Sequence, residues 1–239
     1  MDKLGAGQFA ILLGGNGLAA RYQERIALLY SENYDSFIKL LYKDLDGLIN
    51  QFQANPQNRN KKNEDGLTEE FVTNLCTAGY TASHDTSSGG HVDITVRIGV
   101  HSWIGEAKKD SKFDEGFKQL CTRYRPASGN FEHNHAGMLL YLCKGPNILK
   151  RKKAWEKKLK TLDFESISTY DCKENLNHFY SSHVHDVTGR EFIVRHMPVA
   201  LQFTPTDASA RRSKTAQSVK ILNEKNEVKT RATKKSISK

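Results

Sequence analysis

The sequence predicts a three-layer α/β domain, in which helices cover both faces of a central mixed sheet. Segments with apolar residues at helical spacing alternate along the chain with short segments rich in β-branched residues. The segment 136–144, AGMLLYLCK, is apolar at almost every position, which is typical of a strand covered on both faces. The order of helix, three strands, helix, strand, helix and further strands then indicates helices packed on both sides of one sheet.

The first quarter of the chain is expected to be a helical N-terminal module, residues 1–55. Apolar residues recur at helical spacing through residues 8–52, and the sequence GGNG at 14–17 interrupts them as a helix break. Residues 53–66 are polar and contain Pro and Gly, so they are expected to form a linker.

The α/β core is expected to span residues 64–203. Its first helix, 67–80, has an apolar stripe and closes at Gly79. The other expected elements are strands at 81–86, 91–100 and 102–109, a helix at 113–124, a strand at 136–144, a basic helix at 147–162, and strands at 164–172, 178–186 and 190–203.

Charge is distributed unevenly along the 239 residues. The formal net charge is +9, and residues 204–239 supply most of it with ten Lys or Arg against three Asp or Glu. Such a segment lacks the apolar residues needed for a core, so a basic flexible tail is expected. It is interpreted either as a solvated tail or as an arm that binds nucleic acid.

The cysteines and the hydropathy point to a cytoplasmic protein. Cys76, Cys121, Cys143 and Cys172 form no CxxC pair and have apolar neighbours, which favours reduced, packed thiols over a zinc site. No secretion signal is recognisable at the start of the sequence, and no apolar run reaches the length of about 20 residues that a membrane helix needs. A membrane partner is therefore not expected.

Three charged residues stand in segments that otherwise resemble buried strands: Asp93, Glu106 and Lys108. Side chains alternate between the two faces of a strand, so Glu106 and Lys108 point to the same side, and Asp93 joins them if its strand is the neighbour. Two carboxylates and an ammonium at one place suit the binding of Mg²⁺ and the hydrolysis of a phosphodiester. The alternative is a salt bridge on a surface hairpin, which would contribute little.

The pattern D-x(12)-E-A-K after a helix resembles the PD-(D/E)xK nuclease superfamily, whose members have the restriction-endonuclease-like fold. The resemblance covers residues 64–144, and Val92 stands at the position of the motif's Pro. It implies that Asp93 and Glu106 bind Mg²⁺, for which Mn²⁺ substitutes. It further implies that the backbone carbonyl of Ala107 is another ligand and that Lys108 is the catalytic lysine.

Members of this superfamily often add a glutamate from the helix before the sheet. Glu64, Glu69 and Glu70 are the candidates here. Glu64 is favoured, because it lies seven residues before Phe71 and continues the core-facing stripe if the helix extends back that far.

The helix after the Glu-x-Lys strand shows a second, looser resemblance. Its sequence GFKQLCTRY is similar to the Q-x(3)-Y motif of RecB-type nucleases, although Gln119 and Tyr124 are here separated by four residues. Gln119 is therefore a candidate site residue, and Arg123 and Tyr124 are candidates for DNA contact. An ordinary amphipathic helix is the alternative interpretation.

Further basic residues are candidates for binding the phosphate backbone: Lys109, Lys150, Arg151, Lys152 and Lys153. A solvated basic helix explains 150–160 equally well. The pair His183 and His185 lies on one face of a strand, but with no third ligand nearby a structural zinc site is not favoured.

Together the motifs predict a Mg²⁺-dependent deoxyribonuclease, an endonuclease similar to those of bacterial restriction and anti-phage defence systems. DNA is the expected partner. Because two-strand cleavage needs two active sites, a homodimer, a higher oligomer or a defence-system partner subunit is expected. The alternatives are a non-cleaving nucleic-acid-binding module and a nuclease for RNA or branched DNA.

Overall fold

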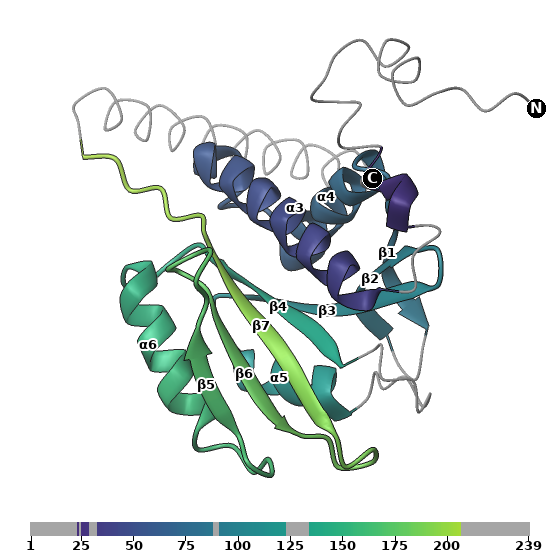
Figure 1. Ribbon diagram of the computed structural model, residues 1–239. Helices are drawn as coiled ribbons and strands as arrows, with labels where there is room; N and C mark the ends of the chain where they lie inside the picture. The colour runs from purple at the N-terminus through teal and green to yellow at the C-terminus, as the bar shows by residue number, and fades with distance from the viewer. Residues whose placement is uncertain (1–22, 24, 29–32, 88–90, 123–133, 207–239) are drawn as a thin grey trace, which may run out of the picture. The chain divides into compact units, whose positions relative to one another are not determined.

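The structure is a computed structural model that describes residues 23, 25–28, 33–87, 91–122 and 134–206 (Figure 1). It confirms the α/β class and the mixed sheet. Over the described residues the sheet has seven strands in the order β1-β2-β3-β4-β7-β6-β5. The segment GGNG, the start of the expected N-terminal module and most of the expected basic tail lie outside the described residues.

The elements follow the expected order closely. The helices are α3 (Tyr34–Ala54), the short 3₁₀ helix η1 (Pro56–Asn58), α4 (Glu64–Thr77), α5 (Phe113–Thr122) and α6 (Ile148–Leu159). The strands are β1 (Thr81–Ser87), β2 (His91–Ile98), β3 (His101–Lys109), β4 (His135–Leu142), β5 (Ser168–Asp171), β6 (Phe179–Val184) and β7 (Glu191–Ala200).

The sheet combines two antiparallel ends with a parallel centre. β1, β2 and β3 form an antiparallel meander, and β5, β6 and β7 form another. Between them β3 pairs in parallel with β4, and β4 pairs in parallel with β7. The parallel connection from β3 to β4 runs through α5, as parallel pairs require a crossover.

Helices cover both faces of the sheet, with α3 and α4 on one side and α5 and α6 on the other (Figure 1). β4 shows why its sequence is apolar throughout. Leu139 and Tyr141 belong to the core beneath α3 and α4, whereas Met138, Leu140 and Leu142 belong to the core beneath α5 and α6. The period of two in a strand supplies both cores from one segment.

α3 shares the core of the sheet. Its apolar stripe is buried in the same cluster as residues of β2, β3 and β7. Asp46 on α3 also joins the helix to the sheet through two buried side chains. Its Oδ2 lies 2.9 Å from Nη2 of Arg195 on β7, and its Oδ1 lies 3.1 Å from Nδ1 of His178. The described residues up to Gln202 thus form one compact unit.

α4 begins three residues earlier than the apolar pattern indicated. Asn63 caps it, since its side-chain oxygen accepts a hydrogen bond of 3.1 Å from the amide of Gly66, and Glu64 and Asp65 occupy the first turn. Cap residues and acidic first turns start helices without any apolar residue, which the periodicity does not detect. The helix ends as expected before Gly79, whose φ is 96°.

Within the part of the chain that the structure describes, no helix is long and apolar enough to cross a membrane. The four cysteines are free thiols, of which Cys121 and Cys172 are buried, whereas Cys76 is exposed and not packed as predicted.

Candidate active site

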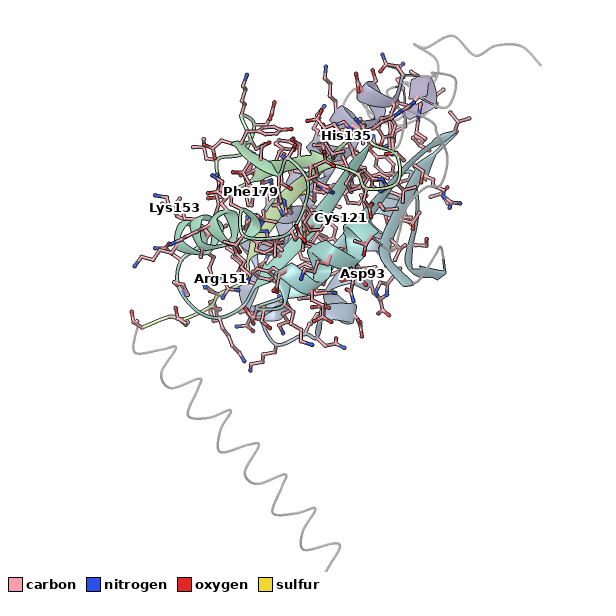
Figure 2. The ribbon with its side chains drawn as sticks, turned by 90° about the horizontal axis from the view of Figure 1, so that it is seen from below. Asp93, Cys121, His135, Arg151, Lys153 and Phe179 are labelled. Atoms are coloured by element: carbon pink, nitrogen blue, oxygen red, sulfur yellow. The ribbon has the colours of Figure 1, made fainter. Side chains whose placement is uncertain are left out.

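The charged residues of β2 and β3 lie together on the sheet face that α5 covers. Asp93 is on β2, and Glu106 and Lys108 are on β3, which is the neighbouring antiparallel strand. Figure 2, which views this side of the sheet, labels Asp93 beside α5. The structure therefore brings together the three residues that the sequence singled out.

The ammonium of Lys108 is surrounded by carboxylates from separate elements. Its Nζ lies 2.6 Å from Oε1 of Glu106 and 3.5 Å from Oδ2 of Asp93. It also lies 3.5 Å from Oε1 of Glu64, the first residue of α4. Glu64 is thus placed at the cluster, whereas Glu70 is paired with Arg59 and Lys62, and Glu69 is exposed.

Backbone amides of β3 hold two of the carboxylates. The amide of Ala107 donates a hydrogen bond of 2.9 Å to Oδ2 of Asp93, and the amide of Lys109 donates one of 2.5 Å to Oε2 of Glu64. The pairing of β2 with β3 ends at Ile94↔Gly105, so the side chain of Asp93 accepts a hydrogen bond from an amide just beyond the paired residues. This fixes both carboxylates without using the side chain of Lys108.

Glu106 is the most buried member of the cluster. Its side chain is 1% exposed, and neither of its oxygens accepts a hydrogen bond of good geometry from a described residue, although Lys108 approaches closely. Burial, followed by the negative charge of Asp93, raises the pKa of Glu106 to about 7, against the opposing effect of Lys108. The folded chain therefore keeps Glu106 protonated to a higher pH than an exposed glutamate.

Lys108 remains an ammonium in this setting. Burial alone would lower the pKa of its side chain, but the contact with Glu106 and the charges of Asp93 and Glu64 outweigh it and raise the pKa above its ordinary value. The cluster thus combines a permanent cation with one carboxylate that is poorly stabilised in its charged form.

A glycine of α5 sets the space available to the cluster, and the sequence analysis missed it. A Cβ added at Gly116 would lie 2.7 Å from Cγ of Lys108 and 3.3 Å from Cγ of Glu106. Gly is unfavourable inside a helix, so its presence in FDEGF was a signal that something approaches closely. α5 can lie this near to the charged side chains only because Gly116 has no side chain.

We expect Gly116→Ala to destabilise the protein by about 1–3 kcal/mol, because the methyl group overpacks the stem of Lys108. The matched control is Gly47→Ala in α3, where an added Cβ meets nothing within 4 Å. That control should instead gain about 0.5–1 kcal/mol from helix propensity. Urea unfolding of both variants measures the difference, and equal gains would contradict the close approach of α5.

The other residues predicted on α5 divide into two groups. Gln119 is half-buried and lies three residues after Gly116, about one turn along the helix. Arg123 and Tyr124 lie outside the described residues.

The predicted backbone-binding residues differ in accessibility. Lys150 and Lys153 are exposed, but Lys152 is buried, with its Nζ 2.6 Å from Oδ1 of Asp171, so the expectation of a solvent-facing Lys152 is corrected. The cause is its position on α6, where it shares the core-facing side with Trp155. Lys109 is also directed to its own chain, since its Nζ donates to the carbonyl of Lys62.

Arg151 connects the start of α6 to the end of β3. Its Nη2 donates a hydrogen bond of 2.5 Å to the carbonyl of Asp110, the residue after β3, and its guanidinium lies over the ring of Phe113. This leaves Arg151 half-buried, with a structural contact beside the cluster.

A metal ion has oxygen ligands available in this cluster. The described residues contain no group of three His, Cys, Asp or Glu side chains already arranged around one point as metal ligands. The donor set nevertheless suits Mg²⁺, because Asp93 is partly exposed and Glu106 is buried with the ammonium of Lys108 as its one close donor among the described residues. The ring of His183, by contrast, packs against Phe164 and Phe117.

Comparisons of the chain with protein-family models, with curated proteins and with solved structures find no match. What the site can do is therefore argued from its own contacts.

Proposed function

We propose that the protein is a metal-dependent deoxyribonuclease that hydrolyses phosphodiester bonds with Asp93, Glu106, Lys108 and Glu64. The observation that supports this most is the buried Glu106, which has a raised pKa and no hydrogen-bond donor beyond the ammonium of Lys108. An unsatisfied buried carboxylate is costly to the fold, and such costs are common where a group has a chemical task.

The carboxylates of Asp93 and Glu106, with the backbone carbonyl of Ala107, would hold Mg²⁺, and Mn²⁺ is expected to substitute. When bound, such an ion polarises a phosphoryl group and lowers the pKa of a water. Glu106 fits this role because a cation would satisfy the buried carboxylate, for which the described residues supply only the ammonium of Lys108. Asp93 fits because the amide of Ala107 already orients its carboxylate.

Lys108 acts on the substrate, and Glu64 positions Lys108. The ammonium of Lys108 is the nearest cation to the carboxylates and would stabilise negative charge that develops on a phosphate. Glu64 holds the other side of that ammonium, and Gly116 keeps α5 close enough to confine it. Gln119, about one turn further along α5, is a candidate for contact with the substrate.

The topology supports the same proposal. The sequence α4-β1-β2-β3-α5-β4, with an antiparallel meander followed by a parallel β4, is the arrangement expected of a restriction-endonuclease-like core. Because the motifs resemble those of nucleases from bacterial restriction and anti-phage systems, we also propose a role in restriction or anti-phage defence. A homodimer or a partner subunit would supply the second active site that two-strand cleavage needs.

The proposal is tested by incubating the full chain with plasmid DNA, linear duplex, branched DNA and RNA in Mg²⁺, in Mn²⁺ or in EDTA. We expect cleavage of DNA that EDTA abolishes and that Asp93→Asn reduces about 100-fold or more, since a ligand carboxylate is lost. Asp65→Asn, at an exposed position on α4, is the control and should cleave normally.

Cleavage that persists in EDTA, or that Asp93→Asn leaves intact, would overturn the proposal. Cleavage of RNA or branched DNA alone would keep the site and change its substrate. Nucleic-acid binding without cleavage of any substrate would favour the alternative of a non-cleaving module.

A further inference from the structure

A row of exposed lysines follows one side of α6. We name it the lysine stripe, and it consists of Lys150, Lys153, Lys157 and the helix C-cap Lys160. Their spacing of three, four and three residues places them within an arc of about 80° at 3.6 residues per turn. The opposite side of the helix is buried through Lys152, Trp155 and Leu159.

The described residues do not neutralise the stripe. All of its members are exposed, and none forms an ion pair with another residue that the structure describes. The acidic residue of α6, Glu156, is half-buried, and its Oε1 lies 3.8 Å from Nζ of the buried Lys152. The positive charge of this helix side is therefore available to a partner.

One residue joins the start of α6 to the end of β3, the strand that carries Glu106 and Lys108. Asp110 follows β3 directly and comes two residues after Lys108. Its Oδ1 accepts a hydrogen bond of 2.9 Å from the amide of Lys144, and its carbonyl accepts the hydrogen bond from Arg151. Lys150, adjacent to Arg151, thus lies at the end of α6 that is joined to the end of β3, and the stripe leads away from there.

We propose that the lysine stripe binds the phosphate backbone of duplex DNA where the duplex leaves the active site. From Lys150 to Lys160 the helix rises about 15 Å, over which one strand of a duplex advances by about four nucleotides. The inference rests on the proposed function, because it identifies the surface that the substrate of that function follows. In the set of residues proposed to bind DNA, Lys157 and Lys160 take the place of Arg151 and Lys152, whose side chains contact their own chain.

The chemistry of α6 favours a nucleic acid over an anionic membrane. A helix that binds a lipid surface needs an apolar side free to enter the interface. The apolar side of α6 is buried against the sheet, and Leu149 is its one exposed large apolar residue among those described. What remains is a narrow line of positive charge, which suits a linear polyanion.

The test compares two triple variants of the full chain with the same net charge. The stripe variant carries Lys153→Gln, Lys157→Gln and Lys160→Gln. The control carries Lys39→Gln on α3, Lys158→Gln on α6 but off the stripe, and Lys173→Gln, which are all exposed. Both keep residues 204–239, so the basic tail contributes equally.

Fluorescence anisotropy in EDTA, over a range of salt concentrations, measures binding of a duplex of about 30 base pairs, which is longer than the stripe. We expect the stripe variant to lose about one unit of the salt slope per lysine, about 3 in all, and to bind about 10–100-fold more weakly at low salt. The control should keep the slope of the unchanged protein.

Equal loss in both variants would show a general charge effect and overturn the proposal, as would no loss in either. Loss of binding to vesicles containing anionic lipid, with DNA binding unchanged, would also overturn it. Because binding is measured in EDTA, the outcome is separate from cleavage. A protein that binds through the stripe but cuts nothing refutes the proposed hydrolysis and leaves the stripe standing.

Discussion

Lys108→Met is expected to reduce DNA cleavage about 10²–10³-fold, the usual cost of removing a group that stabilises developing charge. The unbranched methionine keeps much of the lysine stem that lies against Gly116 and removes only the ammonium. Binding of DNA in EDTA should change by less than about threefold, because the exposed lysines that contact the backbone remain. Single-turnover cleavage with excess enzyme measures the chemical step.

The control for this variant is Lys112→Met, which removes an ammonium from an exposed side chain just past β3. It should cleave at close to the unchanged rate. If Lys108→Met also cleaved normally, the ammonium inside the cluster would be a structural counterion for the carboxylates and would have no part in the chemistry. A parallel loss in DNA binding and in cleavage would instead indicate that the variant disturbs the surface and not the reacting groups.

The removal of this ammonium also has a predictable effect on Glu106. Lys108 opposes the burial and the charge of Asp93, which raise the pKa of Glu106. Without it, Glu106 should hold its proton to a higher pH than it does now. A loss of cleavage in Lys108→Met that is partly relieved at higher pH would therefore reflect Glu106, and one that is independent of pH would reflect the missing ammonium itself.

The positions of the strands and of the charged residues could be predicted because they rest on local signals. The β-branched run of β2 and the apolar run of β4 each have one plausible structure, and period-two alternation placed Glu106 and Lys108 on one face. Asp93 was expected to join them on the condition that its strand pairs beside theirs, as sequential strands usually do. The structure confirms these elements and the contacts within the charged cluster.

The rest depended on contacts between distant segments, which periodicity does not contain. Gly116 was not recognised because its reason lies in two side chains of another element. Lys152 was expected to face solvent because the run KRKK hides which lysine shares the side of Trp155. The burial of Glu106, and with it the raised pKa, depends on the packing of α5 against the sheet, and no local sequence pattern predicts that packing.

Glu106→Gln is expected to stabilise the protein above neutral pH while abolishing cleavage. Glu106 has a pKa of about 7 in the folded chain against an ordinary value of 4.5. The folded state therefore favours the protonated form, so the associated stability is fully present below pH 4.5 and is lost as the pH rises through 7. By pH 8 the loss reaches about 3 kcal/mol, from 1.36 kcal/mol per pKa unit.

Gln cannot ionise, so the variant avoids this loss. Urea unfolding in EDTA should give similar free energies for Glu106→Gln and the unchanged protein at pH 5, and a variant more stable by about 2–3 kcal/mol at pH 8. Glu69→Gln, at an exposed position on α4, is the control and should show no such change with pH. The same advantage at both pH values would mean that better packing, and not charge, distinguishes the variant.

The double variant Glu106→Gln with Lys108→Met separates the two roles of the pair. If the ammonium matters to the fold mainly as a partner of Glu106, removing it should cost less free energy of unfolding in the Gln background than in the unchanged protein. Cleavage should not return, because both groups proposed for the chemistry are gone. A double variant that is as stable as Glu106→Gln alone, and still inactive, would mean that the native cluster lowers the stability of the fold. Selection for function would explain why such a cluster is kept, and selection for stability would not.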